Sequence, residues 1–243
     1  MSNVATADIE SRQLLDSTFI WRVFFIFSAL ALIALAISTA GRFAGHSIAM
    51  AGHTDDTSLA EIVIGNNVLA AQRNMIRFEQ ARKGGVATRL DLYLRWPDLT
   101  GYTDAARDDF NHAGDRKNIV FVSLSESMMS RDMSGRYEPI YSELTESSND
   151  AAPKGLVARR FTEKSGYANE VLYVGETAGR APFVVRCLAG ETAAQSLAPC
   201  ERDIHVGQGL SMLYRFPREL LGDWKRLDQS MGRLAKWMLK TAD

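Results

Sequence analysis

The chain has 243 residues, and its 28 Lys and Arg residues nearly balance its 29 Asp and Glu residues. A chain without a net basic excess does not attract nucleic acid over its whole surface, so we expect no nucleic-acid partner. About two hundred residues follow the one long apolar segment, which is enough for a single sizeable hydrophobic core.

That apolar segment lies near the N-terminus, where residues 23–40 read VFFIFSALALIALAISTA without a charged side chain. A helix of this length crosses the hydrocarbon core of a bilayer, which is about 30 Å thick. Trp21 and Arg22 precede it and suit the headgroup interface. We therefore predict a cytoplasmic tail (1–18), a transmembrane helix (19–40), a juxtamembrane linker (41–58) and one extracytoplasmic domain (59–243).

A cleaved signal peptide is the alternative, with the small residues at 38–41 as its processing site. The leader carries Asp8, Glu10 and Asp16, and the apolar run is longer than a signal core, so we favour an anchor. The stretches NMIR (74–77), LYLRWP (92–97) and YRFP (214–217) resemble proteins of bacterial envelopes that have no assigned function. We expect a bacterial inner-membrane protein whose N-terminus is cytoplasmic and whose C-terminal domain is periplasmic.

Hydrophobic patterning predicts a mainly antiparallel β domain. Residues 87–96 alternate, with Leu90, Leu92 and Leu94 on one face, which indicates a half-buried strand. Regular spacing of β-prone runs and Gly-containing turns favours an antiparallel meander in the second half. Strands are expected at 61–64, 118–124, 156–162, 170–174, 183–188, 202–206 and 210–216. A short helix capped by Thr103 is expected at 103–112, another helix at 135–145, and an exposed excursion over much of 125–153.

The chain closes with an amphipathic helix after Pro217, in which apolar residues recur every three or four positions from Leu220 to Met238. We expect it to pack over the sheet, so the predicted fold class is α+β. A dimeric coiled coil and a membrane-surface helix remain as alternatives, and the oligomeric state stays open.

Cys187 and Cys200 are the only cysteines of the chain. An even pair in a domain outside the cytoplasm predicts a disulfide, which closes a loop of about fourteen residues and contributes roughly 3 kcal/mol. The Cα atoms should then lie about 4.4–6.8 Å apart. Two unbridged buried thiols are the alternative.

One segment has an excess of cations, and within it Arg73, Arg77, Arg89 and Arg95 are candidate ligand-binding residues. Strand alternation places Arg89 and Arg95 on one polar face, and arginine forks suit phosphate or carboxylate oxygens. An anionic lipid or glycan is the ligand class that this pattern suggests. A solvated face balanced by acids elsewhere is the alternative interpretation.

No catalytic motif is present: the sequence lacks a nucleophile elbow, a P-loop and a dinucleotide fingerprint. The histidines at 46, 53, 112 and 205 are scattered, so we assign no catalytic residue, no metal site and no cofactor. The leading hypothesis is a non-enzymatic accessory or scaffold with envelope protein partners. A sensing module for an anionic lipid or glycan comes second, and an envelope hydrolase third.

Overall fold

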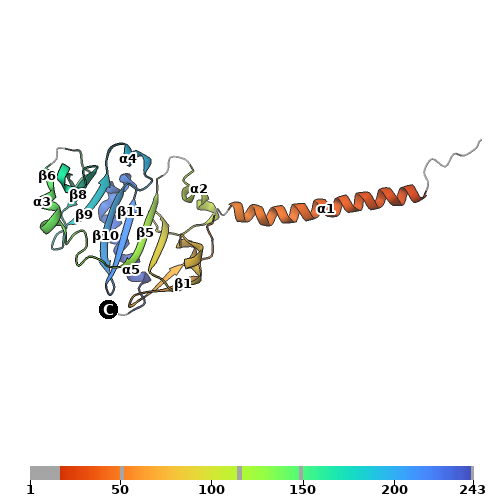
Figure 1. Cartoon of the computed structure of the whole chain (residues 1–243), viewed down its shortest axis with the longest axis horizontal. Coiled ribbons are helices and arrows are strands. Elements are labelled where there is room, and N and C mark those ends of the chain that lie inside the picture. Colours follow the sequence, from red (N-terminus) through yellow and green to blue (C-terminus); the bar gives the residue numbers. More distant parts are fainter. Residues whose placement is uncertain (1–16, 50–51, 114–116, 148–149, 242–243) are drawn as a thin grey trace, which may run out of the picture. The chain divides into compact units, whose positions relative to one another are not determined.

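The structure is a computed structural model that describes residues 17–49, 52–113, 117–147 and 150–241. It divides into two compact units, Met1–Ala49 and Met50–Asp243 (Figure 1). Most of the predicted cytoplasmic tail (1–18) lies outside the described residues.

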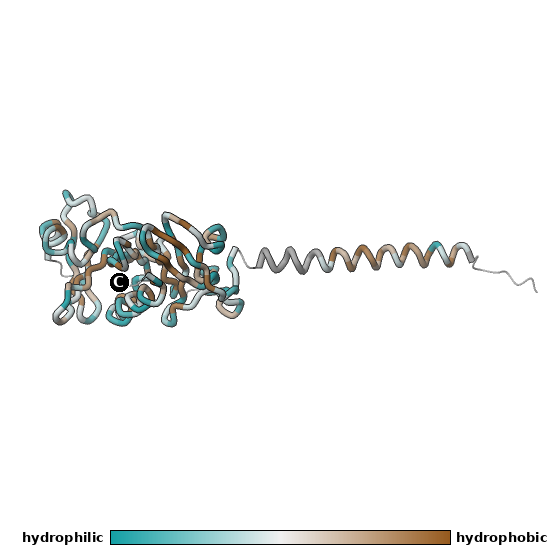
Figure 2. Tube along the Cα trace, turned by 90° about the horizontal axis from the view of Figure 1, so that it is seen from below, coloured by the Kyte–Doolittle hydropathy of each residue, from teal (hydrophilic) through white to brown (hydrophobic). Residues whose placement is uncertain are grey.

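Among its described residues, the N-terminal unit is one helix, α1 (Ser17–Ala49). Its stretch Thr18–Thr39 is long and apolar enough to cross a membrane (Figure 2), and none of it is buried in the structure. Exposing so much apolar surface to water is unfavourable, at about 25 cal/mol per Å². The helix continues through 41–49, which the sequence analysis assigns to the linker, because no proline interrupts its hydrogen bonding there.

The large unit is built on an eight-stranded antiparallel sheet (Figure 1). In spatial order its strands are β4 (Arg89–Arg95), β5 (Ile119–Glu126), β11 (Leu210–Phe216), β10 (Cys200–Val206), β9 (Phe183–Leu188), β8 (Glu170–Gly175), β7 (Val157–Phe161) and β6 (Thr145–Ser147). Strands β6 to β11 follow one another in chain order, which confirms the predicted meander. The sheet is completed where β11 pairs with β5, a contact between residues about ninety positions apart.

A smaller sheet contains β2 (Asn67–Gln72), β1 (Leu59–Ile64) and β3 (Gly85–Val86). The remaining helices are α2 (Arg107–Phe110), α3 (Ser142–Leu144), α4 (Gly190–Gln195) and α5 (Trp224–Met238). Short 3-10 helices occur at Arg73–Met75, Glu79–Lys83, Asp104–Ala106, Glu163–Ser165 and Arg218–Asp223. A short π-helix occurs at Tyr137–Tyr141.

The main core lies between the eight-stranded sheet and α5. Leu90, Leu92 and Leu94 of β4 are buried in it, as the alternation predicts. From α5, Leu227 and Met231 are fully buried in the same core, and each contributes roughly 1.5–3 kcal/mol. The C-terminal helix therefore packs on its own sheet, and its apolar stripe is not available for a coiled coil or a membrane surface.

The predicted disulfide is present between Cys187 in β9 and Cys200 in β10. The two residues are directly opposed in the antiparallel register. Their Cα atoms are 4.0 Å apart, which is below the expected range of about 4.4–6.8 Å. The bridge ties together the connection that contains α4, a helix that the sequence analysis did not predict.

Two local predictions hold only in part. Thr103 makes no side-chain capping bond, and 103–112 forms a turn of 3-10 helix followed by the short α2. The predicted excursion is exposed at 126 and 128–131, but the chain then folds back onto the sheet, where Met133 and Ser134 are buried. Within it, 137–144 forms a π turn and α3 rather than one regular helix.

Reducing the disulfide should lower the stability of the full-length protein by about 3 kcal/mol, because the opened loop regains conformational freedom in the unfolded state. Thermal melting with and without reductant measures this, and a Cys187→Ala/Cys200→Ala double variant should melt like the reduced protein. An unchanged midpoint, with both thiols freely alkylated in the native protein, would contradict the assignment.

Candidate functional site

The eight-stranded sheet is split between β9 and β10, and the candidate site is built around this split. The two strands pair at Cys187 opposite Cys200 and at Arg186 opposite Glu201, and their register ends there. Beyond that point the carbonyl of Val184 accepts a hydrogen bond from Arg202 Nη1 at 2.9 Å instead of from a backbone amide. An arginine side chain thus replaces the missing ladder bond.

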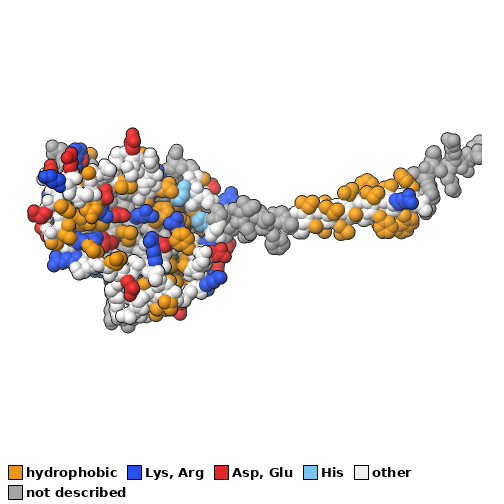
Figure 3. Space-filling view, viewed as in Figure 1, with side chains coloured by type: hydrophobic (Ala, Val, Ile, Leu, Met, Phe, Trp, Pro, Cys, Tyr) orange, Lys and Arg blue, Asp and Glu red, His pale blue; other side chains and the backbone are white. Residues whose placement is uncertain are grey.

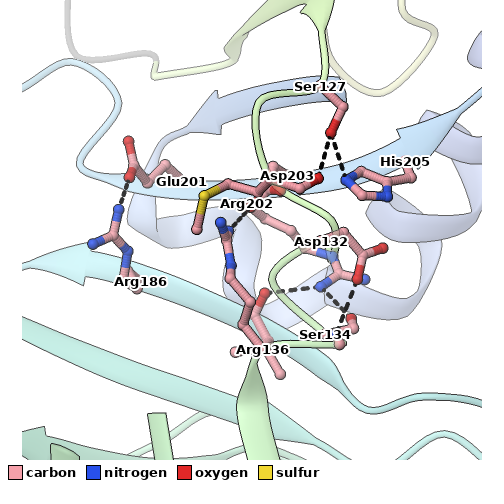
Figure 4. A network of polar contacts seen from close by, with 12 residues as sticks. Ser127, Asp132, Ser134, Arg136, Arg186, Glu201, Arg202, Asp203 and His205 are labelled. Atoms are coloured by element: carbon pink, nitrogen blue, oxygen red, sulfur yellow. Dashed lines mark hydrogen bonds and ion pairs between the residues drawn. The ribbon is translucent and has the colours of Figure 1, made fainter. Parts of the chain in front are cut away.

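Arg202 of β10 is buried, and its guanidinium bonds to three other parts of the chain: β9, the segment around Ser134, and α5. Its Nε donates to Asp228 Oδ1 of α5 at 3.0 Å, and its Nη1 also donates to Ser134 Oγ at 2.9 Å (Figure 4). Tyr214 of β11 donates to the same Asp228 oxygen at 3.0 Å. Burial raises the pKa of Tyr214, so the phenol keeps its proton and stays a donor.

The segment 132–136 is held in the split by its own hydrogen bonds as well. Ser134 Oγ donates to the carbonyl of Pro182 at 2.6 Å, and Asp132 Oδ1 accepts from the backbone amide of Gly135 at 2.9 Å. These bonds place Arg136 on the face of the sheet that points away from α5, which we call the outer face. There Arg136 forms an ion pair with the buried Asp203 of β10.

A hollow of about 270 Å³ lies on the outer face beside this pair. Its floor is ionic, since Arg186 pairs with Glu201 and lies 3.6 Å from Glu170. Burial raises the pKa of both Asp203 and Glu170, and the facing guanidiniums oppose that rise. We call this site the ionic hollow; the charges at its floor are paired with one another.

Ser127 and His205 meet at the rim of the ionic hollow, where Ser127 Oγ lies 2.9 Å from His205 Nε2 (Figure 4). Ser127 Oγ also donates to the carbonyl of Met129 at 2.7 Å. A hydroxyl has one proton, so His205 must be the donor of the first bond. This is the reverse of the arrangement in which a histidine accepts the proton of a nucleophilic serine.

Two methionines beside this pair are exposed. Met128 is 97% exposed and Met129 is 51% exposed, although both line the hollow. Methionine side chains are flexible and polarizable, and they are common at surfaces that adapt to a partner. These two methionines therefore give one part of the rim an apolar and adaptable surface.

A second feature crosses the outer face on the neighbouring strands β4, β5 and β11. Tyr93, Phe121 and Arg215 are directly opposed across these strands. The Arg77 guanidinium lies 4.8 Å from the centre of the Tyr93 ring, and that of Arg215 lies 5.8 Å from the centre of the Phe121 ring. We call Arg77, Tyr93, Phe121 and Arg215 the arginine–aromatic row.

The two arginines of this row are exposed, and neither forms an ion pair with a carboxylate among the described residues. Figure 3 shows arginine and lysine side chains interspersed with hydrophobic ones on this face, where β10, β11 and β5 lie in Figure 1. Cationic groups over aromatic rings suit a ligand that offers carboxylates or other anions.

The four arginines proposed from the sequence occupy different environments. Arg89 contacts Asp91 at 2.7 Å, and Arg95 contacts Asp109 at 3.5 Å. They lie six residues apart on β4, about 20 Å, so one small anion cannot contact both. Arg73 donates to the carbonyl of Arg82 at 3.0 Å and braces the segment before β4. Arg77 joins the row, and ligand binding by this set stays a prediction.

Sequence reasoning missed most of the site. Arg136, Arg186, Arg202, Asp203, His205 and Arg215 come from three separate regions of the chain. The alternation of β10 and β11 could have placed Asp203, His205 and Arg215 on one face. No sequence pattern showed that the segment around Arg136 returns to that face.

No known family model matches the chain, and no curated protein matches it. Among solved structures it is similar to an immunity protein of the Stenotrophomonas maltophilia type IV secretion system, with 12% identity and a TM-score of 0.48, over 76% of this chain and 94% of that one. It is also similar to FrpD, an iron-regulated outer membrane lipoprotein of Neisseria meningitidis, with 9% identity and a TM-score of 0.46, over 78% of this chain and 96% of that one. At this level of similarity, the function of neither protein can be assigned to this chain.

Replacing Arg136 by Met should destabilise the protein by about 3 kcal/mol at pH 8, because Asp203 is left buried and unpaired. Without the cation the folded-state pKa of Asp203 rises further above its ordinary value of 3.8. The folded variant then binds a proton more readily than the unfolded chain, so the deficit should shrink as the pH falls through that raised pKa.

Chemical unfolding at pH 8 and pH 5 measures the effect. An Arg136→Met/Asp203→Asn double variant is the control, and it should recover stability at pH 8 and lose the pH dependence. A single-variant deficit that is equal at both pH values would show that Asp203 does not depend on Arg136.

Proposed function

We propose that this protein is a single-pass, membrane-anchored component of the bacterial envelope that acts as a non-enzymatic accessory or scaffold. Its N-terminus would lie in the cytoplasm and the α+β domain in the periplasm. One observation carries the proposal: Thr18–Thr39 is an apolar helix with no part buried by the chain, attached to a domain that contains a disulfide. Disulfides persist outside the cytoplasm, which supports the orientation.

Binding is favoured over catalysis because the charged groups at the floor of the ionic hollow are held in ion pairs with one another. Asp203 faces Arg136, and Glu201 faces Arg186. A general acid or base needs a proton that it can give or take at the substrate, and His205 is instead bonded to a serine whose own proton is committed. An exposed methionine rim and a row of arginines over aromatic rings are features of a recognition surface.

The partner that this surface fits best is a protein with exposed acidic side chains. The arginine–aromatic row supplies two cations without acidic partners, and aromatic and arginine side chains are the types that contribute most to protein interfaces. The paired Arg89 and Arg95, about 20 Å apart, extend the same face over a distance that a protein surface can span. An anionic glycan is the second candidate, since an extended chain could also contact both ends of β4.

Topology is tested first, with alkaline phosphatase fused after Asp243 in the full-length protein. We expect an active fusion in the membrane fraction, with the N-terminal segment retained at full length. Activity of a cytoplasmic reporter at the same point, with inactive phosphatase, would overturn the orientation. Release of a shortened protein from the membrane would overturn the anchor.

Partner binding is tested by placing a photo-crosslinking amino acid at Ser123, on the outer face of β5, in intact cells. We expect a discrete protein adduct that falls about tenfold in an Arg77→Glu/Arg215→Glu variant, since two lost charge contacts amount to about 1.4 kcal/mol. The matched control is Lys164→Glu/Lys236→Glu, which makes the same change of charge at exposed positions outside the row.

Equal loss of the adduct in both double variants would show that only net charge matters. An adduct that resists protease and is removed by glycan-degrading enzymes would favour the glycan. An adduct indifferent to Arg77 and Arg215 would exclude the row as the binding surface.

A further inference from the structure

A second hollow, of about 330 Å³, lies between the C-terminal half of α5 and the turn that follows β4. It is distinct from the ionic hollow, because its lining residues come from β2, this turn and α5. Leu99 and Leu234 contribute apolar surface, and Gln72, Asp98, Arg233 and Trp237 contribute polar groups. Its lining is divided about evenly between polar and apolar surface, so it matches a ligand that is itself part polar and part apolar.

The turn that carries Asp98 is held in a fixed shape. The backbone amide of Arg95 donates to the carbonyl of Thr100 at 2.8 Å and closes the turn. Leu99 adopts a φ of 53°, a left-handed conformation that a bulky side chain rarely takes, and its side chain is buried in the main core. The buried leucine anchors the turn, so Asp98 is presented from a stiff support, as strained positions at binding sites often are.

The polar groups of this hollow are available to a ligand. The Asp98 carboxylate, the Gln72 amide and the Trp237 indole N–H form no side-chain hydrogen bond or ion pair with any residue that the structure describes. Arg233 is the exception, since its Nη2 donates to Ser230 Oγ at 2.8 Å and is thereby oriented. The hollow therefore offers both hydrogen-bond donors and acceptors, and the negative charge of Asp98 is balanced by the positive charge of Arg233.

Trp237 forms an aromatic wall of the hollow. Trp237 is 45% exposed at the edge of the hollow, and its ring stacks on no aromatic ring among the described residues. An indole face packs well on the C–H face of a pyranose ring, and its N–H still needs an acceptor. Sugar hydroxyls donate and accept at once, which matches a wall that offers an acid, an amide and a guanidinium.

We infer that this hollow, which we call the Trp237 hollow, binds a neutral saccharide. The sugar ring would stack on Trp237, while Asp98 accepts from its hydroxyls and Arg233 donates to them. The balanced charge of the wall argues against a phosphate or other anion, because Asp98 would repel it. This inference rests on the Trp237 hollow alone and does not depend on the proposed function.

The test uses the full-length protein in lipid nanodiscs, which avoid sugar-based detergents, titrated with chitotetraose as the probe. We expect saturable binding by calorimetry, together with a shift of the tryptophan emission in the wild type. Binding should weaken at least about tenfold in Trp237→Ala and in Asp98→Ala, as for residues that carry most of a binding energy.

Lys236→Ala is the matched control, since Lys236 is exposed next to Trp237 but does not line the hollow. It should bind like the wild type. Circular dichroism identifies any variant that fails to fold, and Asp98→Asn, which keeps an acceptor at the same place, should retain part of the binding. Undiminished binding by folded Trp237→Ala, or no saturable binding by the wild type, would overturn the inference.

Discussion

The organisation of the domain depends on the hydrogen bonds made by the buried guanidinium of Arg202. The guanidinium occupies the split between β9 and β10, bonds to Asp228 of α5, and fixes Ser134 in the segment that leads to Arg136. Core helix, sheet and outer face are thus joined through one side chain. A buried charge is costly unless its hydrogen bonds are satisfied, and here the carbonyl, hydroxyl and carboxylate acceptors satisfy them. The outer-face geometry therefore follows from an arrangement made inside the domain.

The two candidate binding surfaces differ in what they offer. The outer face combines the ionic hollow, the methionine rim and the arginine–aromatic row, so it suits a large partner with acidic groups. The Trp237 hollow is a single concavity of about 330 Å³ whose charge is balanced, so it suits a neutral ring. Both belong to a domain attached to an exposed apolar helix, and an envelope protein that holds a partner near a membrane would use features of both kinds.

Sequence reasoning predicted the elements whose signal is local. Alternation identified β4, spacing identified the strands from β7 to β11, and the three- and four-residue repeat identified α5 and the side that it buries. Pairing of Cys187 with Cys200 followed from their number and compartment. What depended on contacts between distant segments was missed: the pairing of β11 with β5, the return of 132–136 to the sheet, and the meeting of Arg77 with Tyr93 beside Arg215. Such contacts leave no periodicity in one sequence.

The most direct test of the account is hydrogen exchange in an Arg202→Lys variant, which keeps the charge but cannot make the several bonds of the guanidinium. The amides of Gly135, Arg136 and Tyr137 all donate within the 132–137 segment in the native protein. If Arg202 fixes this segment, their protection should fall sharply in the variant, while the β4 and β5 ladder keeps its protection. Unchanged protection at 135–137, or a loss spread evenly over the whole domain, would contradict the account.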